Sequence, residues 1–150
     1  MRPQQFDLIA FDWDGTLFDS TALIARCIQR AAVDLGLPEP ELARAKYVIG
    51  MGLREALAHA VPDLPPDQHE ALGLRFRHHY LTSEDELSFF DGTLEMLAAL
   101  KARHHWLAVA TGKTRKGLDR LLHTRELAGV FDATRTADET RSKPHPQMLL

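Results

Sequence analysis

The stretch that decides how this chain folds is Leu8-Ile9-Ala10-Phe11-Asp12-Trp13-Asp14-Gly15-Thr16. It begins with four apolar residues in a row and then changes abruptly to two acids and a glycine. A continuous apolar run of this length is typical of a strand buried on both faces, as in a parallel sheet. The sequence therefore predicts a buried strand from Leu8 to Phe11 that presents Asp12 and Asp14 at its carboxyl end.

A long helical segment is predicted after this strand. Ser20 is expected to cap a first helix, because apolar residues recur at helical spacing in the residues that follow it. Residues 41–61 have the pattern of two shorter helices separated at Gly50-Met51-Gly52, and a further helix is expected to start near Asp67 in a capping box. Residues 17–88 contain no convincing strand.

Strands and helices alternate again in the last third of the chain. Thr93 is expected to cap a helix, and residues 106–110 form a second apolar strand. A helix from about Thr114 and a weaker strand over residues 133–136 follow. This order predicts an α/β protein with a three-layer, Rossmann-like parallel sheet, in which the helical block is an insertion after the first strand.

The composition of the chain excludes several classes of protein. With 150 residues, 45% apolar and 26% charged, the chain fits one globular domain or a core with a modest insertion. The net charge is −3 and no basic stripe is visible, so a nucleic-acid partner is not expected. The single Cys27 excludes an internal disulfide, and no apolar stretch is long enough for a membrane span. A cytoplasmic location is expected.

Polar residues with chemical potential follow both apolar strands. Asp12 and Asp14 can face one cleft at the edge of the sheet where ligands bind, although a solvated turn would use the same residue types. The run Gly112-Lys113-Thr114 is not a phosphate-binding loop, because Leu107 stands where the first glycine belongs. Gly50-Met51-Gly52 lacks the third glycine of a dinucleotide fingerprint and is interpreted as a helix break.

Three short motifs occur in order at the strand ends: Asp12-x-Asp14-Gly15-Thr16, Thr111-Gly112 and Lys143-Pro144. With a helical block between the first two, the whole chain resembles the haloacid-dehalogenase-like hydrolase superfamily. The flanking residues, FDWDGTLFDS at 11–20 and KPHP at 143–146, are most similar to its phosphoglycolate-phosphatase-like branch. The resemblance implies a catalytic core of residues 1–16 and 89–150 with an inserted helical cap of residues 17–88.

The resemblance also implies a role for each motif residue. Asp12 would attack phosphorus to form an aspartyl-phosphate, and Asp14 would protonate the leaving oxygen and later take a proton from water. Thr111 and the backbone N–H of Gly112 would bind the phosphoryl oxygens, while Lys143 would neutralise charge. Because two acids repel a phosphate dianion, Mg²⁺ is expected, held by the Asp12 carboxylate and the Asp14 backbone carbonyl.

The expected partner is a small-molecule phosphate ester, with phosphoglycolate as the best single candidate. The acid at position 14 separates the chain from the dehalogenases proper, whose motif has a non-acidic residue there. Two alternatives stay open: a sugar phosphomutase of the same fold, and an inactive module that binds phosphate or a partner.

One motif of the family has no counterpart in this sequence. The family places one or two further acids after a fourth strand to complete its Mg²⁺ site. Asp138 and Glu139 are the nearest spare acids, but they precede Lys143 and are expected to lie on the wrong loop. The chain is therefore interpreted as an incomplete core, whose first strand would expose unpaired backbone groups.

Overall fold

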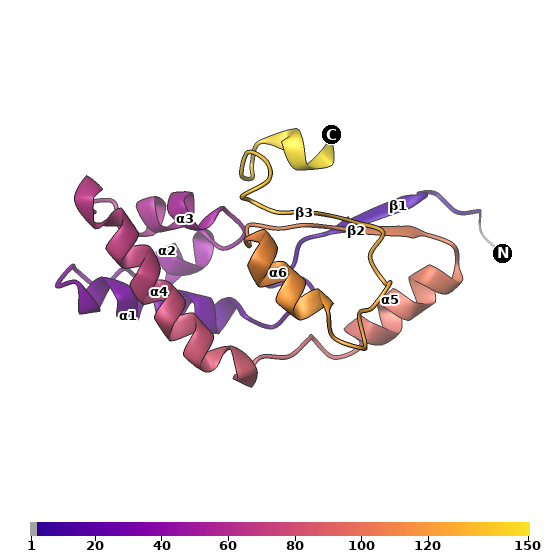
Figure 1. Ribbon diagram of the computed structural model, residues 1–150, viewed down its shortest axis with the longest axis horizontal. Coiled ribbons are helices and arrows are strands. Elements are labelled where there is room, and N and C mark those ends of the chain that lie inside the picture. Colours follow the sequence, from indigo (N-terminus) through magenta and orange to yellow (C-terminus); the bar gives the residue numbers. More distant parts are fainter. Residues whose placement is uncertain (1–2) are drawn as a thin grey trace.

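The computed structural model describes residues 3–150 and contains a parallel sheet with the strand order β1-β2-β3. The strands are β1 (Leu8–Phe11), β2 (Trp106–Ala110) and β3 (Ala133–Arg135). Phe11 pairs with Val109, so β1 and β2 end at the same level. Because the strands are parallel, their carboxyl ends lie along one edge, which faces the helical block (Figure 1). The predicted α/β class and Rossmann-like sheet are confirmed.

Two helices connect the strands. Helix α5 (Thr93–Ala102) leads into β2, and α6 (Arg115–Leu122) leads from β2 towards β3. A short 3-10 helix, η3 (Pro146–Leu149), lies close to the end of the chain. The core under these elements includes apolar side chains from both helices and from β2, namely Leu97, Leu107, Val109 and Leu118.

The helical block has a hydrophobic core of its own. It consists of α1 (Thr21–Asp34), α2 (Leu42–Tyr47), α3 (Leu53–Ala60), η1 (Pro66–Gln68), α4 (His69–Ser83) and η2 (Glu84–Glu86). Helix α1 packs against α2 and α4, and α4 also contacts α3. Fully buried alanines, among them Ala31 and Ala45, let the helices approach closely around Leu72.

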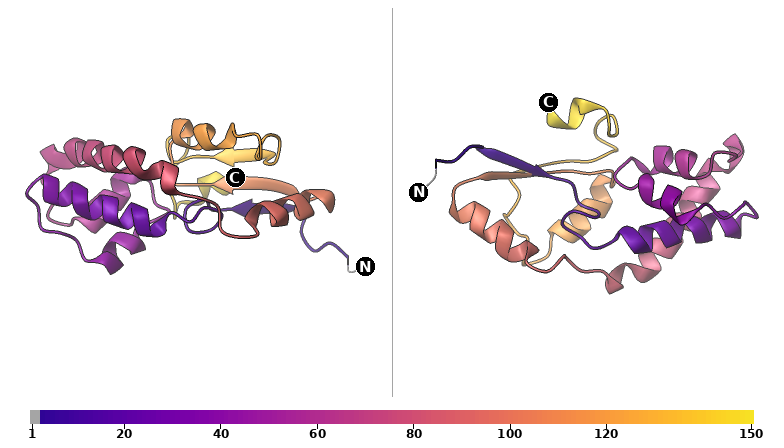
Figure 2. Two further views of the ribbon diagram at one scale, coloured as in Figure 1. Left: turned by 90° about the horizontal axis from the view of Figure 1, so that it is seen from below. Right: turned by 180° about the vertical axis from the view of Figure 1, so that it is seen from behind.

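Two linking segments run side by side between the block and the sheet. The Asp19 N–H donates to the Ser88 carbonyl at 2.9 Å, and the Phe90 N–H donates to the Leu17 carbonyl at 3.1 Å. Leu17 already packs in the core of the sheet. Figure 2 shows the block beside the carboxyl edge of the sheet rather than over either of its faces.

Several local predictions need correction. The apolar run of β1 predicted burial on both faces, and this is wrong: within residues 3–150 β1 is an edge strand and Leu8 is 55% exposed. The exposure of this strand that the missing fourth motif predicted is confirmed for the described residues. Ser20 stands at the N-cap of α1, but its hydroxyl does not cap the helix. The cap of α5 is Gly92, with φ at 81°, and Thr93 is the first helical residue. Asp67 lies in η1, so α4 begins at His69 without a capping box.

Within residues 3–150, no helix has both the length and the apolar character that crossing a membrane requires.

Candidate active site

Asp12 and Lys143 form the centre of the candidate site, at the carboxyl end of β1. The Lys143 amine donates to Asp12 Oδ1 at 2.9 Å and to the Ala110 carbonyl at 3.2 Å. The Trp13 N–H donates to the same carboxylate oxygen at 2.8 Å. One lysine therefore connects the ends of β1 and β2, and it reaches Asp12 across 131 residues of sequence.

Asp14 lies in a more enclosed position than Asp12. Its Oδ1 accepts a 2.7 Å hydrogen bond from the Ser20 hydroxyl, which makes no cap hydrogen bond to α1. The Lys113 amine lies 3.7 Å from the same oxygen, and the side chains of Lys113 and Asp14 are only 12% and 10% exposed. The second oxygen of Asp14 receives no hydrogen bond from any residue in the described part of the chain.

Lys113 connects this acid to the helical block. Its amine donates to the Tyr80 hydroxyl on α4 at 3.0 Å and lies 4.8 Å from the centre of the Tyr80 ring. Burial raises the pKa of the Tyr80 phenol, and the negative charge of Asp14 raises it further. The phenol is therefore neutral at physiological pH. It accepts the hydrogen bond from the Lys113 ammonium group, which keeps its proton.

Gly112, which follows β2, packs closely against the loop at residues 50–52 between α2 and α3. A Cβ on Gly112 would collide with the backbone carbonyl of Met51, so no larger residue fits there without displacing the loop. A Cβ on Gly50 would lie 3.4 Å from Asp12 Oδ2 and 3.8 Å from the Lys143 amine. Gly50 has φ at 101°, a conformation that glycine adopts at little cost. The predicted break between α2 and α3 is confirmed, and it is also the segment of the block that reaches Asp12.

The remaining predicted site residue, Thr111, directly follows β2. Its side chain is fully buried, and its hydroxyl oxygen accepts the N–H of Lys113 at 3.2 Å. Since the Lys143 amine binds the carbonyl of the preceding Ala110, Thr111 lies next to the Asp12–Lys143 pair. The structure therefore brings all five predicted residues to one edge of the sheet, and their catalytic roles stay predictions.

The two spare acids belong to a different interaction. Asp138 accepts hydrogen bonds from the Thr136 hydroxyl at 2.6 Å and from the Arg115 N–H at 2.9 Å. Glu139 binds the Arg115 guanidinium at 2.7 Å, which lowers the pKa of the Glu139 carboxyl to about 2. Both acids hold the loop after β3 to the start of α6, and their carboxylates are engaged there by Thr136 and Arg115 rather than by the Asp12–Lys143 pair.

The residues present fit a magnesium ion for which waters and substrate oxygens supply most of the ligands. No group of three or more His, Cys, Asp or Glu side chains within residues 3–150 could form a complete metal cage. Mg²⁺ is usually bound by only one or two carboxylates together with waters and substrate phosphate. Asp12 Oδ2 accepts no hydrogen bond from a described residue, which leaves it available as such a ligand.

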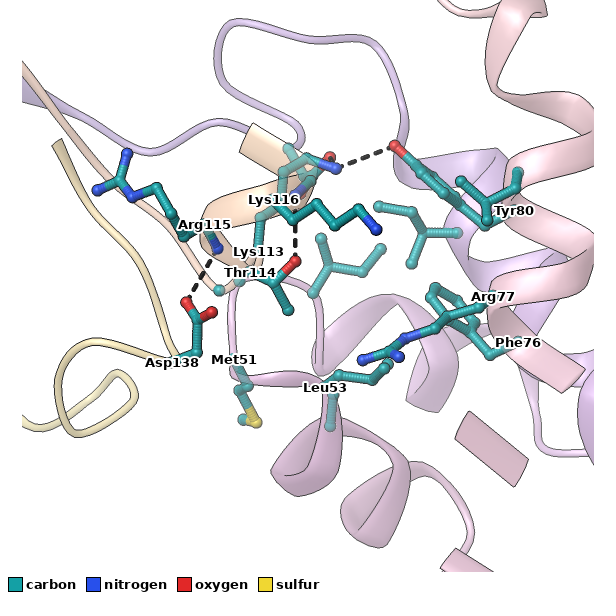
Figure 3. A pocket seen from close by; sticks show the side chains of 18 of the residues that line it. Met51, Leu53, Phe76, Arg77, Tyr80, Lys113, Thr114, Arg115, Lys116 and Asp138 are labelled. Atoms are coloured by element: carbon teal, nitrogen blue, oxygen red, sulfur yellow. Dashed lines mark hydrogen bonds and ion pairs between the residues drawn. The ribbon is translucent and has the colours of Figure 1, made fainter. Parts of the chain in front are cut away.

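A large cavity adjoins these residues. It measures about 1050 Å³ and lies between the helical block and the β2–α6 segment, and its lining includes Asp14, Gly50 and Gly112. Figure 3 shows side chains from both segments that line it, among them Tyr80 and Lys113. No sequence signal marks Tyr80 as a site residue, because its apolar spacing on α4 is that of any core position. Lys113 did have a signal, in its place directly after Thr111-Gly112.

Comparison with known proteins agrees with this arrangement. A family model described as "Haloacid dehalogenase-like hydrolase" matches residues 9–150. The chain is 38% identical over 105 residues to a 5′-nucleotidase from Pseudomonas aeruginosa, covering 70% of this chain and 48% of that protein. It is 29% identical over 155 residues to a phosphoglycolate phosphatase from Aliivibrio fischeri, covering 97% of this chain and 68% of that protein.

A solved structure shares the fold. The crystal structure of a predicted phosphoglycolate phosphatase from Haemophilus somnus superimposes with a TM-score of 0.79 at 29% identity, covering 96% of this chain and 68% of that one. The chain thus spans about half to two thirds of the length of the proteins it matches. The family model extends over nearly the whole chain, from β1 through the helical block to the loop that carries Lys143. The chain belongs to the haloacid dehalogenase-like hydrolase family.

Proposed function

We propose that this protein is a magnesium-dependent phosphatase that hydrolyses small phosphate monoesters through an aspartyl-phosphate on Asp12. The observation that supports this most is the 2.9 Å contact between the Lys143 amine and Asp12 Oδ1. A cation held against the nucleophile reduces its repulsion of an incoming phosphate dianion. Family membership and the phosphatase relatives support the same reaction class.

In the first step, an Asp12 carboxylate oxygen attacks phosphorus and the bond from phosphorus to the leaving oxygen breaks. Asp14 gives its proton to that leaving oxygen. In the substrate complex Oδ2 is the oxygen that carries this proton, because the Ser20 hydroxyl already donates to Oδ1. The Thr111 hydroxyl and the Gly112 N–H donate to the phosphoryl oxygens, as the end of β2 brings both beside Ala110.

In the second step, water attacks the aspartyl-phosphate and gives a proton to Asp14. The bond between phosphorus and Asp12 breaks, so that inorganic phosphate leaves and both acids return to their starting states. Magnesium, when bound by Asp12 and the backbone carbonyl of Asp14, would neutralise charge on the transferring phosphoryl group. Lys143 keeps the Asp12 carboxylate oriented during both steps.

The first substrate to test is phosphoglycolate, because relatives named for that activity match nearly the whole chain. Nucleoside 5′-monophosphates are a second candidate, supported by the Pseudomonas aeruginosa relative. The proposal includes a cytoplasmic location, with which the single free cysteine, Cys27, is consistent.

The direct test compares phosphate release by the wild-type chain, Asp12→Asn and the matched control Asp63→Asn, each with Mg²⁺ and with a chelator. Asp63 is an exposed acid of the helical block, remote in sequence from every motif. We expect Asp12→Asn to lose roughly a thousandfold or more of turnover, and Asp63→Asn to lose none. Undiminished turnover in Asp12→Asn, or equal turnover in the chelator, would remove the proposed mechanism.

A further inference from the structure

The cavity beside the candidate site is much larger than a glycolate leaving group. Its volume of about 1050 Å³ is at the upper end of the range for pockets that enclose drug-sized ligands. Glycolate has only two carbons and would leave most of this space to water. The size of the cavity therefore favours a leaving group with a ring or a similarly bulky body.

The wall that the helical block contributes is apolar and partly aromatic. Phe76 and Tyr80 lie one turn apart on α4, and their rings stack with centres 5.9 Å apart and planes inclined by 15°. Ile24, Ile28 and Leu53 continue the apolar wall on α1 and α3. Binding a flat apolar group against such a wall is favourable, because it removes apolar surface from water. The wall makes no comparable interaction with a small polar acid.

Two cations at the cavity have no partner within the described part of the chain. Five Lys or Arg side chains line the cavity against three acids. Three of the five are engaged: Lys113 by Tyr80, Arg115 by Glu139 and Arg120 by Glu84. Arg77 on α4 and Lys116 on α6 form neither an ion pair nor a side-chain hydrogen bond within residues 3–150. Figure 3 shows that they come from opposite sides of the cavity, with the Arg77 guanidinium extended into it.

The position of these two cations differs from that of the catalytic lysine. Lys143 contacts Asp12, where the scissile phosphate would be bound, and it does not line the cavity. Arg77 and Lys116 are exposed, so they lie where the cavity opens to solvent. They can therefore bind an anion at the far end of a leaving group whose middle part contacts Phe76 and Tyr80.

We infer that the substrate is a phosphate monoester whose leaving group carries a flat apolar ring and, on the far side of that ring, a second anionic group. The ring packs against Phe76 and Tyr80, and the second anion binds Arg77 and Lys116. This inference rests on the proposed phosphatase function and specifies its substrate class. Arg77 and Lys116 are specificity residues, since they contact neither the scissile phosphate nor Asp12.

Four compounds separate the contributions of ring and anion: ethyl phosphate has neither, phenyl phosphate has the ring, phosphoglycolate has the anion, and 4-carboxyphenyl phosphate has both. Binding to the Asp12→Asn chain with Mg²⁺ is measured by calorimetry, so that turnover does not interfere. We expect the ring to strengthen binding roughly tenfold or more, because it removes apolar area from water. We expect the carboxylate on the ring to add roughly threefold for each exposed cation.

Variants of the two cations test their assignment. Arg77→Gln and Lys116→Gln, each combined with Asp12→Asn, should each lose roughly threefold in affinity for 4-carboxyphenyl phosphate and should bind phenyl phosphate unchanged. Arg54→Gln on the exposed side of α3 is the matched control and should change neither affinity. A loss that is equal for both compounds would contradict a contact with the carboxylate.

The outcomes distinguish this inference from the proposed function. If the wild-type chain hydrolyses all four esters but the ring and the carboxylate bring no gain in affinity, the substrate class is wrong and the phosphatase stands. If phosphoglycolate binds more tightly than 4-carboxyphenyl phosphate, the substrate class is likewise wrong. If no ester binds and none is hydrolysed, the proposed function fails together with the inference.

Discussion

Gly112 contacts the loop at residues 50–52 between α2 and α3. From this contact we predict that replacing glycine by alanine has opposite effects on stability at position 112 and at position 73. In Gly112→Ala the new methyl group would collide with the Met51 carbonyl, and it would also lie 2.9 Å from the Gly50 carbonyl. These neighbours are backbone atoms, so the overlap can be relieved only by moving the loop. Inserting a methyl group into such a packed position costs about 1–3 kcal/mol.

Gly73→Ala is the matched control. Gly73 lies inside helix α4, and the nearest atom to its added methyl group would be Leu57 Cδ1 at 4.0 Å, an ordinary contact distance. Alanine is more favourable than glycine in a helix by about 0.5–1 kcal/mol, partly because it restricts the unfolded chain. Gly73→Ala should therefore raise the free energy of unfolding while Gly112→Ala lowers it.

Urea denaturation followed by circular dichroism measures both changes. A loss of about 2 kcal/mol in Gly112→Ala corresponds to a decrease in Tm of roughly 4–8 °C for a chain of this length. Phosphate release should fall as well, since the displaced loop includes Gly50 beside Asp12. If Gly112→Ala unfolds at the same or a higher urea concentration than the wild type, the loop does not press on the end of β2 and the reasoning is wrong.

Three further predictions concern the core, the candidate site and pH. Leu72→Ala should lower the free energy of unfolding by about 2–5 kcal/mol, because the side chain is fully buried. Leu74 is 58% exposed, so Leu74→Ala should change it by less than about 0.5 kcal/mol in the same denaturation assay. Lys143→Met should reduce turnover by roughly a hundredfold or more. It should change the free energy of unfolding by less than about 1 kcal/mol, because the ion pair of Lys143 is partly exposed. A large loss of stability with normal kinetics would contradict the proposed role. Arg115 lowers the pKa of Glu139 from 4.5 to about 2, so this ion pair stabilises the fold above pH 4.5 and the stabilisation is lost as the pH falls towards 2. The Tm of Glu139→Gln should therefore decrease less than that of the wild type over this pH range. Identical profiles of Tm against pH would exclude this contribution.

The sequence predicts the regular elements well where apolar runs have clear ends. The strand from Trp106 to Ala110 is predicted with the bounds that the structure has, because an apolar run is followed directly by Thr111-Gly112. The break between α2 and α3 is predicted for a similar reason. The burial of β1 could not be predicted from its composition, because exposure depends on which strands lie beside it. A run of four apolar residues has the same sequence pattern in an edge strand as in a central strand.

The candidate site is predicted only in the part that short motifs encode. Asp12 and Lys143 are 131 residues apart, and no spacing rule relates them, so their contact was expected from the resemblance of the motifs rather than from local pattern. The partnership of Lys113 with Tyr80 was not expected, since it depends on how α4 is oriented against the sheet. Contacts between the helical block and the sheet are set by packing, and single-sequence periodicity carries no information about them.

The sheet and the helical block contribute different kinds of side chain to the candidate site. The carboxyl edge of the sheet supplies the charged groups, because strand ends and their turns fix short polar side chains such as Asp12 and Thr111. The helical block supplies apolar surface and one long cation, because α4 places Phe76, Arg77 and Tyr80 along one cavity. In the proposed mechanism the reacting phosphate would therefore depend on residues whose positions are set by backbone pairing. Selection of the leaving group would depend largely on side chains of a block that contacts the sheet through Lys113 and the loop at Gly50. Substitutions in α4 should thus change which ester is accepted and leave the order of chemical steps unaltered.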